Sequence, residues 1–98
     1  MSDIKPRDIA VSLAGHDSGR AYVVIKTDGS FAILTDGKTK KLANPKKKNL
    51  KHLRLGKVGT AALLALDFSD GAADSVIRKQ LAIFRSEADV TEEGSQLV

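Results

Sequence analysis

The 98-residue chain contains no cysteine and no tryptophan, and only four of its residues are aromatic. The absence of cysteine excludes disulfides and thiolate metal sites, and it fits a reducing compartment such as the cytoplasm. Four aromatic side chains limit the hydrophobic core to a modest size. The chain also lacks the run of about 20 apolar residues that a transmembrane helix needs, and its first residues lack the apolar core of a signal peptide. We therefore expect one small, soluble, cytoplasmic domain.

Positive charge is concentrated between Lys38 and Arg54. This stretch holds eight lysine or arginine residues and no acidic residue, whereas the whole chain has a net charge of only +4. Residues 1–55 carry a net charge of +7 and residues 56–98 a net charge of −3. Leucines lie among the cations, and a disordered basic tail would not need them. The stretch predicts a basic surface attached to a small fold, with a polyanion as its partner.

Three short strands are predicted in the first third of the chain. Apolar residues alternate over residues 9–13, which indicates a half-buried strand. Residues 21–25 and 31–34 are rich in β-branched and aromatic side chains, which favour strands. Gly15 and Gly19 bracket the loop between the first two strands, where the backbone needs positive φ angles or a close approach to another group.

Two tight turns and two further strands complete the predicted sheet. Asp-Gly pairs at residues 28–29 and 36–37 are typical of hairpin turns. Residues 38–42 can form a fourth strand, and residues 53–55 alternate again as a short fifth. A helix over residues 46–55 is the alternative for that region. Short strands separated by frequent turn signals indicate a small antiparallel barrel, since closure removes exposed edges.

The segment IAVSLAGHDSGRAYVVI (residues 9–25) resembles a KOW motif, in which a glycine-bracketed loop joins two apolar strands. The sequel FAILTDGKTKKLANPKKKNLKHLRL (residues 31–55) is similar to bacterial KOW-domain RNA-binding proteins. Those proteins in turn resemble the KOW-bearing large-subunit ribosomal proteins of the fourteen-e group. The likeness covers residues 7–55 and, more faintly, the segment IRKQLAIFR (residues 77–85). It implies an SH3-like barrel that binds RNA, most often ribosomal RNA. The chain departs from the motif after Gly19, where Arg20-Ala21-Tyr22 replaces a glycine-rich second turn.

Candidate RNA contacts fall into two groups. The glycine loop could bring backbone N–H groups and Arg20 to a phosphate, and the lysines of the basic stretch can act as point charges on phosphates. The predicted RNA-binding residues are Gly15, His16, Ser18, Gly19, Arg20, Lys38, Lys40, Lys41, Lys46, Lys47, Lys48, Lys51, His52 and Arg54. We expect Tyr22 and Phe31 to be core residues. Without exposed aromatic rings for base stacking, structured RNA is favoured over single strands.

Signatures of catalysis and of metal binding are missing. His16, Asp17 and Ser18 are adjacent in one loop and cannot line up as nucleophile, base and orienting acid. His16 and His52, without cysteine or suitably spaced carboxylates, do not predict a metal site. No Gly-Lys-Ser/Thr follows the glycine loop, so it is not a P-loop. We expect neither enzymatic activity nor a cofactor.

A helix is predicted over residues 72–87. Ile77, Leu81 and Phe84 fall at positions i, i+4 and i+7, which form one helical face. This face is expected either to pack on the barrel or to bind a protein partner. Residues 57–66 can form a short helix or a strand, with the helix favoured. Residues 89–98 are polar and acidic and predict a frayed tail.

The sequence thus predicts a mainly β protein, with an SH3-like KOW barrel over residues 5–55 and a helical extension over residues 56–98. The predicted function is the docking of structured RNA, above all ribosomal RNA, in a ribosome-associated or assembly role. The alternative is a protein-interaction module that engages an acidic partner, since SH3-like barrels serve both purposes. Membrane binding is not expected, because the lysines lack an adjacent apolar face.

Overall fold

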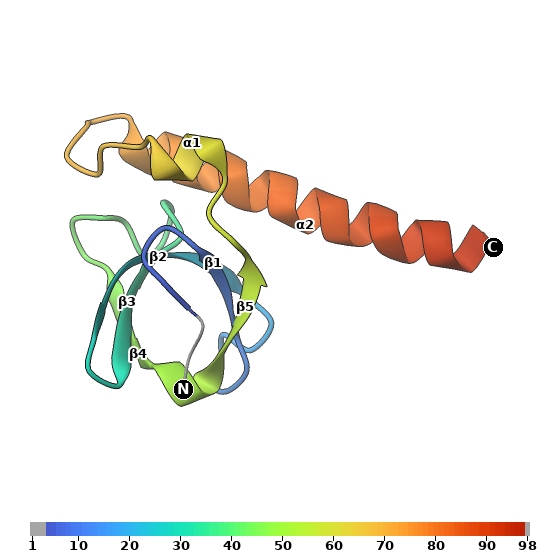
Figure 1. The fold of residues 1–98 in the computed structure, drawn as a ribbon, viewed down its shortest axis with the longest axis horizontal. Coiled ribbons are helices and arrows are strands. Elements are labelled where there is room, and N and C mark those ends of the chain that lie inside the picture. Colours follow the sequence, from blue (N-terminus) through green and yellow to red (C-terminus); the bar gives the residue numbers. More distant parts are fainter. Residues whose placement is uncertain (1–3, 98) are drawn as a thin grey trace.

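A computed structural model describes residues 4–97 of the chain, with the side chains described as far as Glu87. Five strands form one antiparallel sheet in the order β4-β3-β2-β1-β5 (Figure 1). The strands are β1 (Ile9–Ser12), β2 (Ala21–Asp28), β3 (Phe31–Thr35), β4 (Lys46–Asn49) and β5 (Leu53–Lys57). Consecutive strands pair along the chain until β4, and β5 then returns to pair with β1. β4 and β5 are therefore the two edges of the sheet, and the single 3₁₀ turn η1 (Leu50–His52) connects them.

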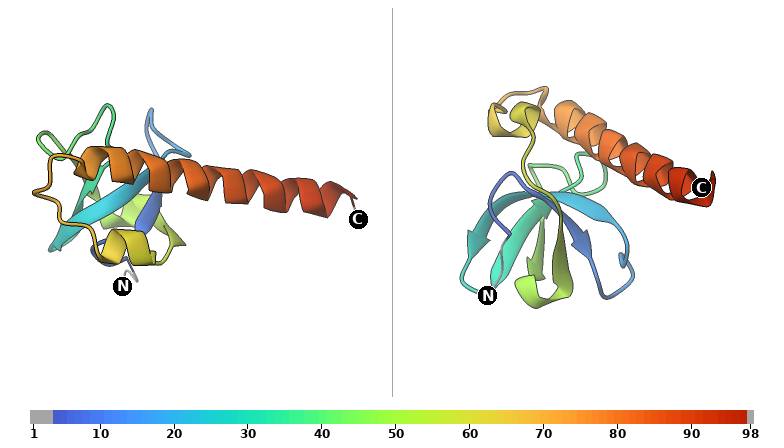
Figure 2. Two further views of the ribbon diagram at one scale, coloured as in Figure 1. Left: turned by 90° about the horizontal axis from the view of Figure 1, so that it is seen from above. Right: turned by 45° about the vertical axis from the view of Figure 1, so that its right-hand side comes forward.

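Two helices follow the sheet and lie on one side of it (Figure 2). The favoured helix within residues 57–66 is confirmed as α1 (Ala61–Leu64), which Thr60 caps by accepting a hydrogen bond from the backbone N–H of Leu63. α2 (Ala73–Leu97) begins one residue after its predicted start. Within residues 4–97, no helix combines the length and the apolar character that crossing a membrane requires.

α2 continues ten residues beyond its predicted end, and it projects past the sheet (Figure 1). The predicted irregular segment over residues 89–98 is thus helical as far as Leu97, while Val98 lies outside the described residues, and fraying of this helix end stays a prediction. Residues 88–97 contain no proline and include Ala88, Glu92, Glu93 and Gln96, which have high helix propensity. Polar composition alone did not distinguish a helix from an irregular tail.

Hydrophobic residues cover both faces of the sheet. One face carries a cluster built around Tyr22, Val24 and Leu34. The other face carries Ile9, Val11, Ala21 and Val23, which pack against the helices through Leu63, Ile77 and Leu81. Ile77 and Leu81 are buried, so the predicted apolar face of α2 packs on the sheet.

The fourth strand lies later in the chain than predicted. Residues 38–42 form a loop, because the carboxylate of Asp36 satisfies polar groups that a strand would pair with its neighbour. Asp36 accepts hydrogen bonds from the backbone N–H groups of Lys38 (2.9 Å) and Lys40 (2.7 Å) and from the Thr39 hydroxyl (2.7 Å). Pairing with β3 begins only after this loop, at β4. The alternative helix over residues 46–55 does not form, and only the 3₁₀ turn η1 within this range is helical.

The loop of residues 36–42 is attached to the first turns of α2. Arg78 donates a 2.6 Å hydrogen bond to the carbonyl of Gly37, and Asp74 accepts one of 3.0 Å from the backbone N–H of Leu42. Gly37 has a φ of +71°, and a Cβ at this position would clash with the Asp74 carbonyl. Glycine is therefore required here both for its backbone angle and for the close approach of the loop to the helix.

Phe31 lies outside the core, contrary to expectation, whereas Tyr22 is confirmed as a core residue. The pairing of β3 with β4 places Ala32 and Leu34 on the buried face, so the alternate position of Phe31 faces outward. Its side chain is 37% exposed, and Lys47 Nζ lies 4.5 Å from the ring centroid. Hydrophobic alternation does not by itself show which residues of a strand face the core.

Candidate nucleic-acid interface

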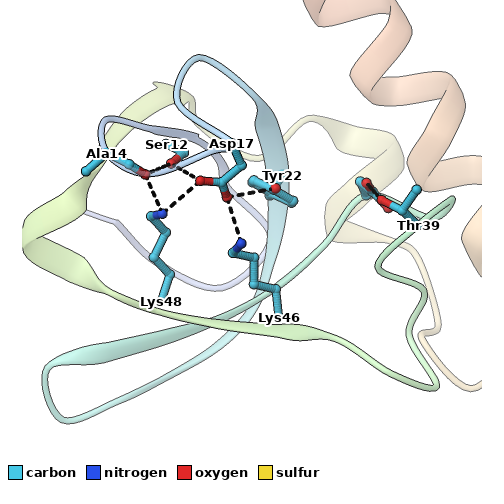
Figure 3. Close-up of polar contacts among 8 residues, drawn as sticks. Ser12, Ala14, Asp17, Tyr22, Thr39, Lys46 and Lys48 are labelled. Atoms are coloured by element: carbon cyan, nitrogen blue, oxygen red, sulfur yellow. Dashed lines mark hydrogen bonds and ion pairs between the residues drawn. The ribbon is translucent and has the colours of Figure 1, made fainter.

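Asp17 links the glycine loop to β4. Its carboxylate forms ion pairs with Lys46 (3.0 Å) and Lys48 (2.9 Å), and it accepts hydrogen bonds from the hydroxyl groups of Ser12 and Tyr22, both at 2.9 Å (Figure 3). Asp17 is only 8% exposed. We call these five residues the Asp17 cluster. A buried carboxylate with four such partners is fully satisfied, so the cluster fixes the loop to the edge strand.

The electrostatics of the Asp17 cluster keep its carboxylate ionised. Burial alone would raise the pKa of Asp17, but the hydrogen bonds from Lys48, Lys46, Tyr22 and Ser12 outweigh it and hold this pKa well below its ordinary value. The same contact acts in the opposite sense on the phenol. Burial and the neighbouring Asp17 carboxylate raise the pKa of Tyr22 to about 12.

Two of the predicted RNA-binding lysines therefore have a structural partner. The Lys48 side chain is 12% exposed and also donates a 2.7 Å hydrogen bond to the carbonyl of Ala14. The Lys46 side chain is 29% exposed and points to the same carboxylate (Figure 3). Their neighbour Lys47 is exposed, since successive side chains of a strand point to opposite faces.

The glycine loop is closed by its own hydrogen bonds. Gly15 and Gly19 both have a φ of +89°. The backbone N–H groups of Ser18, Gly19 and Arg20 donate to the carbonyls of Gly15, Ser12 and Asp17. These three N–H groups are thus engaged within the protein and are not available to a phosphate. The side chains of His16, Ser18 and Arg20 remain exposed.

A second group of cations lies where β4, η1 and β5 follow one another. Lys47, Lys51 and Arg54 are exposed, and no acidic side chain in the described part of the chain pairs with them. We call these three residues the basic corner. His52, in the same turn, is half-buried, and its carbonyl accepts a hydrogen bond from the backbone N–H of Leu13.

The remaining predicted cations lie on the loop after β3. Lys38 and Lys41 are exposed and Lys40 is half-buried. Lys38 and Arg20 line the same open cavity, together with Arg78 and Arg85 of α2. The two helical arginines are not among the residues that the sequence predicts to bind RNA. Their spacing of seven residues, which places both on one helical face, was the available signal.

Among residues 4–87, no three histidine, cysteine, aspartate or glutamate side chains come together as a metal site requires. A scan against models of known protein families and a search of curated proteins find no match to this chain.

Proposed function

We propose that this protein binds structured RNA, above all ribosomal RNA, in a ribosome-associated or assembly role in the cytoplasm. One observation carries the proposal. Of the eight cations between Lys38 and Arg54, two pair with Asp17, and the other six have no acidic partner in the part of the chain that the structure describes. Such an excess of uncompensated positive charge on a folded surface favours the phosphate backbone of a nucleic acid.

We also propose that the sheet is an SH3-like barrel of the KOW class. A glycine-bracketed loop joins β1 to β2, and β5 returns to pair with β1. The three-residue turn η1 then connects the two edge strands. These features support a strongly curved sheet whose edges lie near each other, which is the arrangement that the KOW-like sequence pattern implies.

Structured RNA is the favoured ligand because the exposed surface is rich in charge and poor in aromatic rings. Phe31 is the exposed aromatic side chain among the described residues, and Lys47 already covers one face of its ring. A single ring is a weak platform for stacking successive bases of a single strand. Lysine and arginine contacts to phosphates suit an RNA helix recognised by its shape and backbone.

The test is a titration of fluorescently labelled ribosomal RNA hairpins with the full-length protein at several salt concentrations. We expect the logarithm of affinity to fall with the logarithm of salt concentration with a slope of about −3 to −5, which corresponds to roughly four to six phosphate contacts. Unpaired strands of the same composition should bind more weakly. Lys51→Glu and Arg54→Glu should each weaken binding by about fivefold or more and reduce the slope by about one.

Lys79→Glu is the matched control. Lys79 is exposed on α2, it forms none of the described ion pairs, and its replacement changes the net charge by the same amount. Equal losses in all three variants would mean that only net charge matters and would remove the basic corner from the interface. Absence of hairpin binding at low salt would refute RNA binding. Ribonuclease-resistant association with an acidic protein would then favour the protein-interaction alternative.

A further inference from the structure

An open cavity of about 610 Å³ lies between α2, the end of the glycine loop and the loop after β3. Its volume falls in the range of about 300–1,000 Å³ that is typical of ligand sites. Arg20 reaches it from the glycine loop, Lys38 from the loop after β3, and Arg78 and Arg85 from α2. We call it the α2 cavity. Four cations from three separate segments of the chain thus line one concave surface.

The lining has a strong positive bias. Asp36 is the single acidic residue among the lining residues, and the four cations leave a net charge of +3. The Asp36 carboxylate is already engaged, because it accepts the hydrogen bonds of its own loop. Although burial opposes this, hydrogen bonds from Thr39, Lys38 and Lys40 keep the pKa of Asp36 below its ordinary value. The Asp36 carboxylate therefore stabilises its own loop, and it forms no ion pair with the arginines among the described residues.

Three of the four cations are available to a ligand. Within the described residues, the side chains of Arg20, Lys38 and Arg85 form no hydrogen bond and no ion pair. Arg78 uses two of its N–H groups, one to the Gly37 carbonyl and one to the Ser75 hydroxyl, and so has others left. The contact with Gly37 also holds Arg78 in place, so part of the cation set is ordered before a ligand arrives.

The chemistry points to a phosphodiester ligand. Guanidinium groups bind phosphate oxygens through two parallel hydrogen bonds, which distinguishes them from the point charges of lysine. Leu81, Ala82 and Ala21 supply apolar lining between the cations. A polar ligand with no anionic group would leave the excess positive charge uncompensated. A purely apolar ligand would have to desolvate the guanidinium groups without pairing them.

We propose that the α2 cavity is a second RNA contact, in which Arg20 and Arg85 bind successive phosphates of the RNA backbone while Arg78 anchors the wall. This inference rests on the proposed function and extends it, because it assigns part of the interface to the C-terminal helix. The basic corner and the α2 cavity together would let one RNA engage both the sheet and the helix.

The test uses the hairpin titration with the variant Arg20→Gln/Arg85→Gln. Neither side chain forms a hydrogen bond or an ion pair within the described residues, so the fold should survive, and circular dichroism checks this. We expect a loss of affinity of about 5- to 30-fold and a salt slope smaller in magnitude by about two. Lys79→Gln, on the same helix and outside the cavity lining, should change affinity by less than about twofold. Arg85→Gln alone should give an intermediate loss, which guards against an effect specific to the double variant.

A second measurement locates the contact without mutation. Amide chemical shifts of ¹⁵N-labelled protein titrated with the same hairpin should change at Gly19, Ala21, Thr39 and Ala82, which line the cavity. If the hairpin binds while these amides stay unmoved and the double variant binds like wild type, the α2 cavity is not an RNA contact, although RNA binding stands. If wild-type protein binds no hairpin at low salt, RNA binding itself is refuted, and the cavity proposal falls with its premise.

Discussion

Replacement of Asp17 by asparagine should destabilise the protein strongly, although the two side chains have nearly the same shape. Asp17 forms ion pairs with Lys46 and Lys48 and accepts hydrogen bonds from Ser12 and Tyr22. Asparagine offers one acceptor oxygen in place of two and carries no charge. The Lys48 ammonium group, on a side chain only 12% exposed, then has no counterion.

The expected cost follows from the burial of these partners. Removing one member of a buried ion pair costs about 3–5 kcal/mol, whereas exposed pairs contribute about 0–1 kcal/mol. Lys46 is partly exposed and can turn toward water, so we expect about 3 kcal/mol for Asp17→Asn. A domain of this size has a free energy of unfolding of about 5–15 kcal/mol. The melting temperature should accordingly fall by about 12–24 °C.

The assay is urea unfolding, followed by far-ultraviolet circular dichroism and by the fluorescence of Tyr22, the single tyrosine in a chain without tryptophan. Lys48→Met alone should cost about 1–2 kcal/mol, because Lys46 still pairs with the carboxylate. The double variant Asp17→Asn/Lys48→Met should lose less stability than the sum of the losses in the two single variants. The difference, which is the coupling energy, should be about 1–2 kcal/mol. A loss below about 1 kcal/mol for Asp17→Asn, or no coupling, would refute the assigned role of the cluster.

The Asp17 cluster also predicts a pH dependence. Because the pKa of the folded-state carboxyl is lowered, its stabilising contribution is complete above the unfolded-state pKa, which is close to the ordinary value of 3.8. The contribution is lost as pH falls from there through the folded-state pKa. The difference in stability between wild type and Asp17→Asn should therefore be constant from about pH 5 to 8 and should shrink below about pH 4. A difference in the free energy of unfolding that stays constant below about pH 4 would contradict this role of Asp17.

Three further perturbations test Tyr22 of the Asp17 cluster, the loop after β3 and the outward-facing Phe31. Absorbance titration should show Tyr22 ionising near pH 12. Because the pKa of Tyr22 is raised in the folded state, the stabilising contribution of Tyr22 should be lost as pH rises above 10, the ordinary pKa of tyrosine. Gly37→Ala should cost about 2–4 kcal/mol in urea unfolding, because it introduces strain at positive φ and a clash with Asp74. Phe31→Ala should cost less than about 1 kcal/mol, whereas Leu34→Ala, in the core, should cost about 2–5 kcal/mol.

Each of these expectations has a contrary outcome. Tyrosinate absorbance that appears near pH 10 would mean that the phenol is not buried beside a carboxylate. A Gly37→Ala variant as stable as wild type would show that the loop after β3 is not held against α2. Equal losses in the free energy of unfolding for Phe31→Ala and Leu34→Ala would mean that Phe31 is a core residue.

Local sequence patterns predicted much of the fold. The glycine-bracketed loop, the first three strands and the fifth, and the start and apolar face of α2 were all predicted, because each depends on residue spacing or turn chemistry within a short segment. The position of β4 was not predicted. It depends on Asp36, which holds residues 38–40 in a loop through contacts that hydrophobic periodicity does not report.

The candidate site, like the fold, was predicted in part from the sequence and in part decided by the tertiary structure. The excess of lysine and arginine between residues 38 and 54 is a property of the sequence alone, and it determined the expectation of a polyanionic partner. Which cations are free was decided by the tertiary structure, because Asp17, some thirty residues away along the chain, engages Lys46 and Lys48. The same holds for Arg20 and Arg85, which only the packing of α2 on the sheet brings to one cavity. Charge composition is additive along a chain, whereas the pairing and gathering of charges depend on distances that only the folded state defines.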